Sequence, residues 1–226
     1  MEQQFTTKID NQAGDVTELV FILDKSGSME GLESDTIGGF NAMIKKQKSL
    51  EGKALVSTLL FSDHTKVLHD RKPLEEIKPL TLKDYEVDGC TALLDAIGDA
   101  IKHISNVHKY ARKEDVPNKT MFIITTDGME NASTRYSSNK IKDMIKRKEE
   151  HGWEFIFLAS NIDAVETAKT IGIEEERAVN YDVREQTEEM FEILSDTVCQ
   201  YRTFGCVPDN YAKKFEKKLK NKRKRK

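Results

Sequence analysis

The chain has 226 residues, of which 38% are hydrophobic and 33% are charged, and its formal net charge is −3. This length is enough for one compact domain with a substantial core and short for two. No apolar run reaches the roughly 18 residues that a membrane span needs. The polar N-terminus also lacks the pattern of a secretory signal, so we expect a cytoplasmic protein without a membrane span.

The charge is unevenly distributed along the chain. Residues 212–226 hold ten Lys or Arg and one Glu, a net charge of +9, so the residues before them carry −12. We therefore divide the chain into an N-terminal extension (1–16), one domain (17–205) and a basic C-terminal tail (206–226). Such a tail is typical of contact with nucleic acid, an anionic surface or an acidic partner, or it is simply a solvated chain end.

Apolar runs alternate with amphipathic stretches, which predicts a layered fold of alternating strands and helices. The predicted strands are residues 19–23, 54–61, 121–125 and 155–158, with an antiparallel partner at 65–69 and an edge strand near Val179. The predicted helices are residues 34–50, 91–108, 138–150, 163–171 and 185–204, and Ser34 is the expected N-cap of the first. The fold class is therefore α/β: a doubly wound, mostly parallel central sheet with one antiparallel edge strand and helices on both faces.

Cysteines and histidines do not form the patterns of a metal or redox site. Cys90, Cys199 and Cys206 are widely spaced and include no CxxC pair, so we expect free, partly buried thiols. None of the five histidines has HxxxH or HExxH spacing. We therefore expect them to be structural or exposed.

Oxygen-bearing side chains gather where predicted buried strands end. The strand at 19–23 runs into Asp24, and the strand at 121–125 is followed within two residues by Asp127. Ser26 and Ser28 follow the first aspartate, and Thr91 opens the strongest predicted helix. In doubly wound sheets ligands bind outside the carboxyl ends of the strands. Two carboxylates and three hydroxyls there suit a hard divalent cation, favouring Mg²⁺ and leaving Mn²⁺ and Ca²⁺ open.

This set resembles the metal-ion-dependent adhesion site of the von Willebrand factor A (vWA) family. The family pattern Asp-x-Ser-x-Ser is present in FILDKSGSM, the threonine in GCTALLDAI and the second aspartate in TTDGMEN. The resemblance covers roughly residues 17–204. It implies a vWA, Rossmann-like fold with a bound cation. Ser26, Ser28 and Thr91 would offer their hydroxyls to this cation, and Asp24 and Asp127 would bind it directly or through water. One open coordination position would then accept an Asp or Glu from a partner protein.

Several neighbouring residues have more modest predicted roles. We expect Asp95 to hydrogen-bond a loop rather than to bind metal, and Glu130 and Asn131 to line the rim of the site. Lys25 fills a variable position of the motif, where it either lowers the negative charge of the site or is solvated.

Three classes of function follow. The first is a non-catalytic module that binds a partner's carboxylate through the cation. The second is a Mg²⁺-dependent hydrolase or phosphotransferase, against which stand the lack of a GxxxxGK[ST] loop, of a GxSxG elbow and of a visible base. The third is a nucleic-acid-associated factor that acts through the basic tail. We expect the first, and the sequence does not name the partner.

Overall fold

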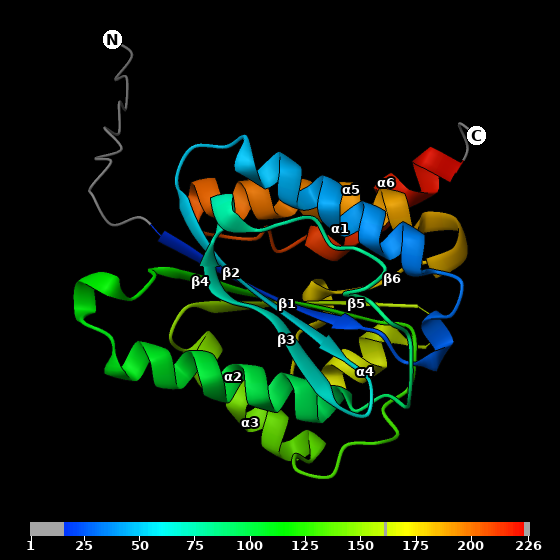
Figure 1. Ribbon diagram of the computed structural model, residues 1–226, viewed down its shortest axis with the longest axis horizontal. Helices are drawn as coiled ribbons and strands as arrows, with labels where there is room; N and C mark the ends of the chain where they lie inside the picture. The colour runs from blue at the N-terminus through cyan, green and yellow to red at the C-terminus, as the bar shows by residue number, and fades with distance from the viewer. Residues whose placement is uncertain (1–15, 161, 224–226) are drawn as a thin grey trace.

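A six-stranded sheet forms the centre of the computed structural model, which describes residues 16–160 and 162–223. The strands lie in the order β3-β2-β1-β4-β5-β6 (Figure 1). Their bounds are β1 Val16–Asp24, β2 Lys53–Phe61, β3 Thr65–Pro73, β4 Lys119–Thr126, β5 Trp153–Ala159 and β6 Ala178–Asn180. Only β2 and β3 pair antiparallel, and the other neighbours are parallel. The predicted sheet type, with its antiparallel edge strand, is confirmed.

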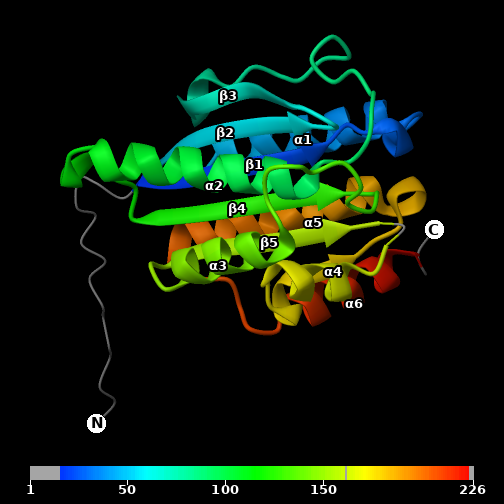
Figure 2. The same cartoon turned by 90° about the horizontal axis from the view of Figure 1, so that it is seen from below.

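Helices cover both faces of the sheet (Figures 1 and 2). Their bounds are α1 Glu33–Lys48, α2 Leu93–Tyr110, α3 Ser138–Glu149, α4 Ala164–Ile171, α5 Val183–Phe204 and α6 Tyr211–Arg223. One hydrophobic cluster joins the sheet to α1, α5 and α6. A second joins it to α2, α3 and α4. None of the described helices is both long and apolar enough to cross a membrane.

Strand β1 shows why the sequence predicts this fold. Residues 19–23 are fully buried and alternate between the two clusters, with Phe21 on the α1 side and Ile22 on the α2 side. A strand covered on both faces needs apolar residues at every position, which produces a continuous run rather than an alternating pattern. Strand β1 lies between β2 and β4 and pairs in parallel with both. The strand order therefore reverses between β1 and β4, and doubly wound sheets bind ligands outside the carboxyl ends of the strands at such a reversal.

Two helices differ from the prediction. Helix α1 begins at Glu33 with Leu32 at the N-cap position and no side-chain cap, so Ser34 is not the cap. Leu32 and the nearby Met29 are buried, and their packing, rather than a hydroxyl, fixes where the helix begins. The predicted basic tail contains helix α6, whose Tyr211 and Phe215 are buried in the core.

The remaining boundaries stay predictions. The division into an extension, a domain and a tail rests on the sequence, and residues 1–15 and 224–226 lie outside the described residues. The three cysteines are free, with Cys90 and Cys206 exposed and Cys199 half-buried.

Candidate metal centre

Two aspartates lie at the switch between β1 and β4. Strand β1 ends at Asp24, Asp127 directly follows β4, and the two strands pair in parallel with Leu23 opposite Thr125. Both aspartates are 2% exposed. The sheet therefore brings two buried carboxylates to one edge, as the sequence predicts.

The loop after β1 places two serine hydroxyls beside them. The Ser26 backbone N–H donates to Asp24 Oδ1 at 2.8 Å, which turns the loop back over the end of the strand. The Ser26 and Ser28 hydroxyl oxygens are 3.2 Å apart, and the Ser28 hydroxyl donates to Asp127 Oδ1 at 2.5 Å. Hydroxyls and carboxylates from loops about a hundred residues apart thus form one group.

Thr91 completes the group. Its loop is tied to the first one by the Gly27 N–H, which donates to the Gly89 carbonyl at 3.0 Å. Asn131 holds Thr91 from the other side: its Oδ1 accepts from the Thr91 N–H at 2.9 Å, and its own N–H donates to the Thr91 carbonyl at 3.0 Å. Helix α2 begins at Leu93 without a side-chain cap. Thr91 is therefore not the cap of this helix.

Gly128 shows how closely the hydroxyls approach one another. A Cβ atom at this position would lie 2.9 Å from Thr91 Oγ1 and 3.3 Å from Ser28 Oγ. Only a residue without a side chain fits there without moving the two oxygens. The structure thus brings all five predicted residues together around one small space.

Asp24 and Asp127 differ in how many of their carboxylate oxygens accept a hydrogen bond. Asp24 Oδ2 accepts from the Thr126 hydroxyl at 2.6 Å, so both oxygens of Asp24 have a partner. Asp127 Oδ2 is buried and has no hydrogen-bond partner among the described residues. A buried carboxylate oxygen without a partner is costly. A cation beside it would remove that cost, so the donor set fits a hard divalent ion.

The electrostatics of the two carboxylates support this fit. Burial raises the pKa of Asp24 above its ordinary value, although hydrogen bonds from Ser26 and Thr126 oppose the rise. Burial also raises the pKa of Asp127, against the hydrogen bond from Ser28, and the nearby charge of Asp24 raises it further. Both carboxylates would be stabilised in their charged form by a bound cation.

Lys25 is held beneath the site rather than in it. Its side chain is buried, and its ammonium group forms an ion pair with Asp88 Oδ1 and lies 3.3 Å from Ser62 Oγ. The Tyr85 hydroxyl donates to the Asp24 carbonyl in the same region. These contacts join the loops. No cationic side chain among the described residues forms an ion pair with Asp24 or Asp127, although the charge of Arg184 acts to lower the pKa of Asp127. Lys25 is therefore not solvated.

The other rim residues act through the backbone. Asp95 accepts from the N–H groups of residues 134, 135 and 136, which confirms its predicted role in holding a loop. Glu130 accepts from the Leu94 N–H at 2.9 Å and from the N–H groups of residues 132 and 133. Glu130 and Asn131 thus fix the loop after β4 against the start of α2.

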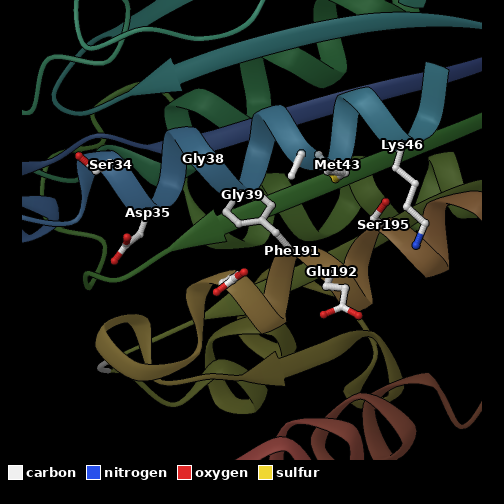
Figure 3. A pocket seen from close by; sticks show the side chains of 11 residues that line it. Ser34, Asp35, Gly38, Gly39, Met43, Lys46, Phe191, Glu192 and Ser195 are labelled. Carbon is white, nitrogen blue, oxygen red and sulfur yellow. The ribbon is translucent and has the colours of Figure 1, made fainter. Parts of the chain in front are cut away.

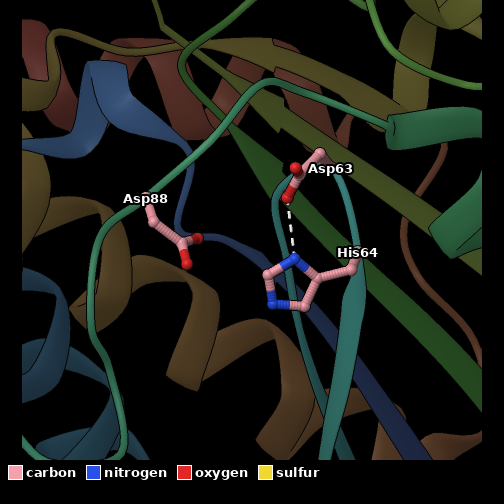
Figure 4. A group of neighbouring side chains, drawn as sticks. All are labelled: Asp63, His64 and Asp88. Carbon is pink, nitrogen blue, oxygen red and sulfur yellow. Dashed lines mark hydrogen bonds and ion pairs between the residues drawn. The ribbon is translucent and has the colours of Figure 1, made fainter.

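A second group of side chains that could hold a metal ion lies nearby, and one of its two carboxylates is already paired with Lys25. Figure 4 shows Asp63, His64 and Asp88, whose potential ligand atoms all lie within 4.8 Å of one another. All three are exposed, and Asp63 Oδ1 is 2.7 Å from His64 Nδ1. The hydrogen bond from Lys25 holds the pKa of Asp88 below its ordinary value. A divalent cation there would be repelled by the Lys25 ammonium, which favours the site at Asp24 and Asp127.

A large hollow lies away from both groups. It has a volume of about 520 Å³ between α1 and α5, where Phe191 lies against Gly39 (Figure 3). Its charged lining residues carry both signs, and none of the five predicted site residues lines it. The hollow therefore plays no part in the candidate metal centre.

Similar folds occur in proteins of very different context. The vWF domain of the type V pili tip protein Mfa5 from Porphyromonas gingivalis is 12% identical, with a TM-score of 0.61 over 87% of this chain and 99% of that one. A D319A mutant of the PilB minor pilin from Streptococcus sanguinis is 15% identical, with a TM-score of 0.61 over 87% and 64%. Proximal thread matrix protein 1 from the mussel byssus is 14% identical, with a TM-score of 0.55 over 81% and 46%. At these identities the likeness shows the fold alone, and this chain spans less than two thirds of the last two.

The family itself is shown by the sequence match. A search among curated proteins found no relative of this chain. A family model described as VWA domain containing CoxE-like protein matches residues 9–164, which is more than half of the chain. The chain therefore belongs to the family of VWA domain containing CoxE-like proteins.

Proposed function

We propose that this protein is a non-catalytic binding module that grips a carboxylate of a partner protein through a divalent cation. Asp24, Ser26, Ser28, Thr91 and Asp127 would hold the cation, and Mg²⁺ suits this small, oxygen-only set. The observation that carries the proposal is Asp127 Oδ2, a buried oxygen that has no hydrogen-bond partner in residues 16–160 and 162–223 and belongs to the same group as the three hydroxyls. A vWA fold with such a group supports binding rather than turnover.

The five residues would have different roles in binding the cation. Asp24 and Asp127 supply two negative charges that balance a divalent cation, and the serine and threonine hydroxyls supply neutral oxygens. A hard cation with an open coordination position takes a further oxygen ligand, which a carboxylate of a partner protein would supply. The hydrogen bonds that hold Asp24 and Thr91 in place keep these oxygens ordered. The cytoplasmic location stays a prediction from the sequence.

Catalysis is less well supported by the surroundings of the site. In the part of the chain that the structure describes, no lysine or histidine hydrogen-bonds to the site's carboxylates or hydroxyls, and Lys25 is engaged with Asp88. A hydrolase would need a base within hydrogen-bond reach of the attacking water.

Metal binding is the first test. Titration calorimetry with Mg²⁺ and with Mn²⁺ should show one site in the wild type and none in Asp127→Asn, which keeps the shape of the side chain but removes its charge. Glu30→Gln, in an exposed residue that follows the serine motif, is the matched control and should bind as the wild type does. Equal binding by Asp127→Asn would contradict the assigned site.

Partner binding is the second test. The wild type and an Asp24→Ala/Thr91→Ala variant would be used to capture proteins from the lysate of the native host, in Mg²⁺ and in chelator. A protein retained only by the wild type in Mg²⁺ supports the proposal. Identical retention under all conditions contradicts it, even if the metal binds.

The basic tail offers a second candidate, binding to nucleic acid or another anionic surface. Lys213, Lys214 and Lys217 of α6 are exposed, which supports it. Because Phe215 is buried, removal of the whole helix would damage the core. A chain that ends at Lys218 loses six basic residues but keeps this contact. Salt-sensitive binding to nucleic acid that disappears in the shortened chain would establish the tail's role.

A further inference from the structure

Helices α2 and α3 lie on the sheet face opposite α1 and α5 (Figure 2). A groove lies between these two helices. It consists of two adjoining hollows of about 520 and 460 Å³, which share Ser105, Lys148 and His151. The first hollow lies between the facing sides of the two helices. The second continues past the end of α2 to residues 116–118 and Trp153. We call the two together the α2–α3 groove.

Positive charge lines this groove without compensation. Five basic side chains contribute to it: Lys102, Lys109, Lys140, Arg147 and Lys148. None of the described residues that line either hollow is an Asp or Glu. No ion pair joins any of the five to a carboxylate within the described residues. On a domain whose residues before 212 carry a net charge of −12, such a concentration of unpaired basic groups stands out.

A basic residue on the same face shows the contrast. Arg135, just before α3, lies 3.2 Å from Asp95 and 2.6 Å from Asp99, so its charge is neutralised within the protein. Lys148 has no such partner. Burial lowers its pKa, and the neighbouring charge of Arg147 lowers it further. An anion in the groove would favour the charged form of Lys148.

The groove also has an apolar part. Ile101 forms a buried patch of its lining, with the half-buried side chains of Tyr136 and Met144 beside it. Hollows of this kind accept an apolar side chain while charged groups at the rim contact its neighbours. A ligand that matches the groove is therefore both anionic and partly apolar.

We propose that the α2–α3 groove binds an acidic peptide segment of a partner protein, with an apolar side chain set between its carboxylates. Lys102 from α2 and Lys140 and Arg147 from α3 would contact the carboxylates. The apolar side chain would lie against the half-buried Tyr136 and Met144. Charge complementarity favours this occupant, because the rest of the domain repels acidic segments and directs them to this face.

A peptide fits the groove better than a single-stranded nucleic acid does. Proteins that bind single-stranded nucleic acid usually combine a basic groove with exposed aromatic side chains on which the bases stack. The Trp153 ring is only 8% exposed, and it contacts Phe122, with ring centroids 5.3 Å apart, and Lys148, whose ammonium lies 4.7 Å from the ring centre. A long phosphate chain would also leave the groove and meet the acidic remainder of the domain, whereas a short peptide would not.

The groove is separate from the candidate metal centre. The metal centre lies at the carboxyl ends of β1 and β4. The groove extends to Trp153 at the beginning of β5, which is parallel to β4, and so lies toward the amino ends of these strands. The five residues assigned to the cation do not line the groove. Peptide binding here therefore needs no divalent cation.

The test measures fluorescence anisotropy of a labelled synthetic peptide built of Glu-Glu-Leu repeats, with the full-length chain in chelator at physiological salt. Lys140→Glu reverses a charge in the groove. Lys142→Glu makes the same change on the same helix but outside the groove, and both residues are exposed. We expect Lys140→Glu to weaken binding roughly tenfold, because an attractive contact becomes repulsive. Lys142→Glu should bind as the wild type does.

Two further comparisons test whether the groove itself binds the peptide. Lys102→Glu on α2 should weaken binding as Lys140→Glu does, and circular dichroism checks that each variant is folded. The matched pair on α3 also separates the groove from the basic tail, which both variants retain. Equal affinity of Lys140→Glu and Lys142→Glu would overturn the proposal. So would displacement of the peptide by oligouridylate at lower concentrations than by unlabelled peptide, since this identifies nucleic acid as the preferred ligand.

Discussion

Strand β1 carries two buried carboxylates, Glu18 and Asp24, whose hydrogen-bond and ion-pair partners differ. Glu18, near the beginning of the strand, is fully buried and lies 2.7 Å from Arg71 and 2.6 Å from His108. Asp24, at its end, is 2% exposed and accepts hydrogen bonds only from neutral donors, the Thr126 hydroxyl among them. Within the part of the chain that the structure describes, Glu18 has a cationic partner in Arg71, and Asp24 has none.

The difference separates a structural charge from a binding charge. Burying a carboxylate is costly unless it is paired. Glu18 is paired with Arg71 when the chain folds, so its charge is compensated within the protein. Asp24 shares its surroundings with Asp127, whose Oδ2 has no partner. The charge of these two close, buried carboxylates is not balanced by an ion pair within the protein, and a bound metal cation would balance it.

The largest expected effect comes from removing a partner of Glu18. Arg71→Met would leave this carboxylate buried with His108 alone and should lower the free energy of unfolding by about 3 kcal/mol, measured by urea denaturation. The double variant Glu18→Gln/Arg71→Met removes the stranded charge and should recover much of the loss. Arg112→Met, in an exposed ion pair, should cost little. A fully stable Arg71→Met would show that this carboxylate does not need its cation.

A comparable effect of opposite sign is expected from adding a cation at Asp24 and Asp127. Mg²⁺ at a hundred times its dissociation constant should stabilise the wild type by about 2.7 kcal/mol, measured by urea denaturation with and without chelator. Asp127→Asn should show no such gain, and in chelator it should be at least as stable as the wild type, since it buries no second charge. Equal stabilisation of both proteins by Mg²⁺ would place the ion elsewhere.

These two regions were not equally predictable from the sequence. Asp24 and Asp127 follow apolar runs that must be buried strands, so their position at one sheet edge follows from the pattern. Glu18 carries no such signal, because its partners Arg71 and His108 are 53 and 90 residues away. Only the tertiary fold selects which distant cation meets a buried acid.

The same limit applies to contacts around the site. Thr126 stands next to Asp127 in the sequence, but its hydroxyl donates to Asp24, 102 residues away. The tail shows a related limit: its charge predicts solvation, whereas Tyr211 and Phe215, four residues apart, pack into the core. A short apolar spacing within a basic run is a weak signal for a packed helix, and here packing outweighs composition.

A smaller effect is expected from filling the space between the site's hydroxyls. Gly128→Ala would place a Cβ atom 2.9 Å from Thr91 Oγ1, so the hydroxyl must shift. Mg²⁺ affinity should fall roughly tenfold, or about 1.4 kcal/mol, in titration calorimetry. Gly38→Ala in α1, where a Cβ meets no atom within 4 Å, is the control and should leave affinity unchanged. Unchanged affinity in Gly128→Ala would mean that Thr91 does not contribute to the site.

Glu149, at the end of α3, is a third carboxylate without adequate compensation, and it gives the smallest effect. Burial, with the charges of Glu174 and Glu154, raises its pKa from 4.5 to about 7, against the opposing charge of Arg177. Between these values the folded protein keeps a proton that the unfolded chain has lost, so the free energy of unfolding should fall as the pH rises from 4.5 to 7 and level off above. Because the residue is half-exposed, solvent screening limits the fall to about 1 kcal/mol. Urea denaturation across this range should show Glu149→Gln more stable than the wild type at pH 8 and equal to it at pH 4.5. No difference at pH 8 would mean that this charge, unlike those of Asp24 and Asp127, is sufficiently solvated to need no partner.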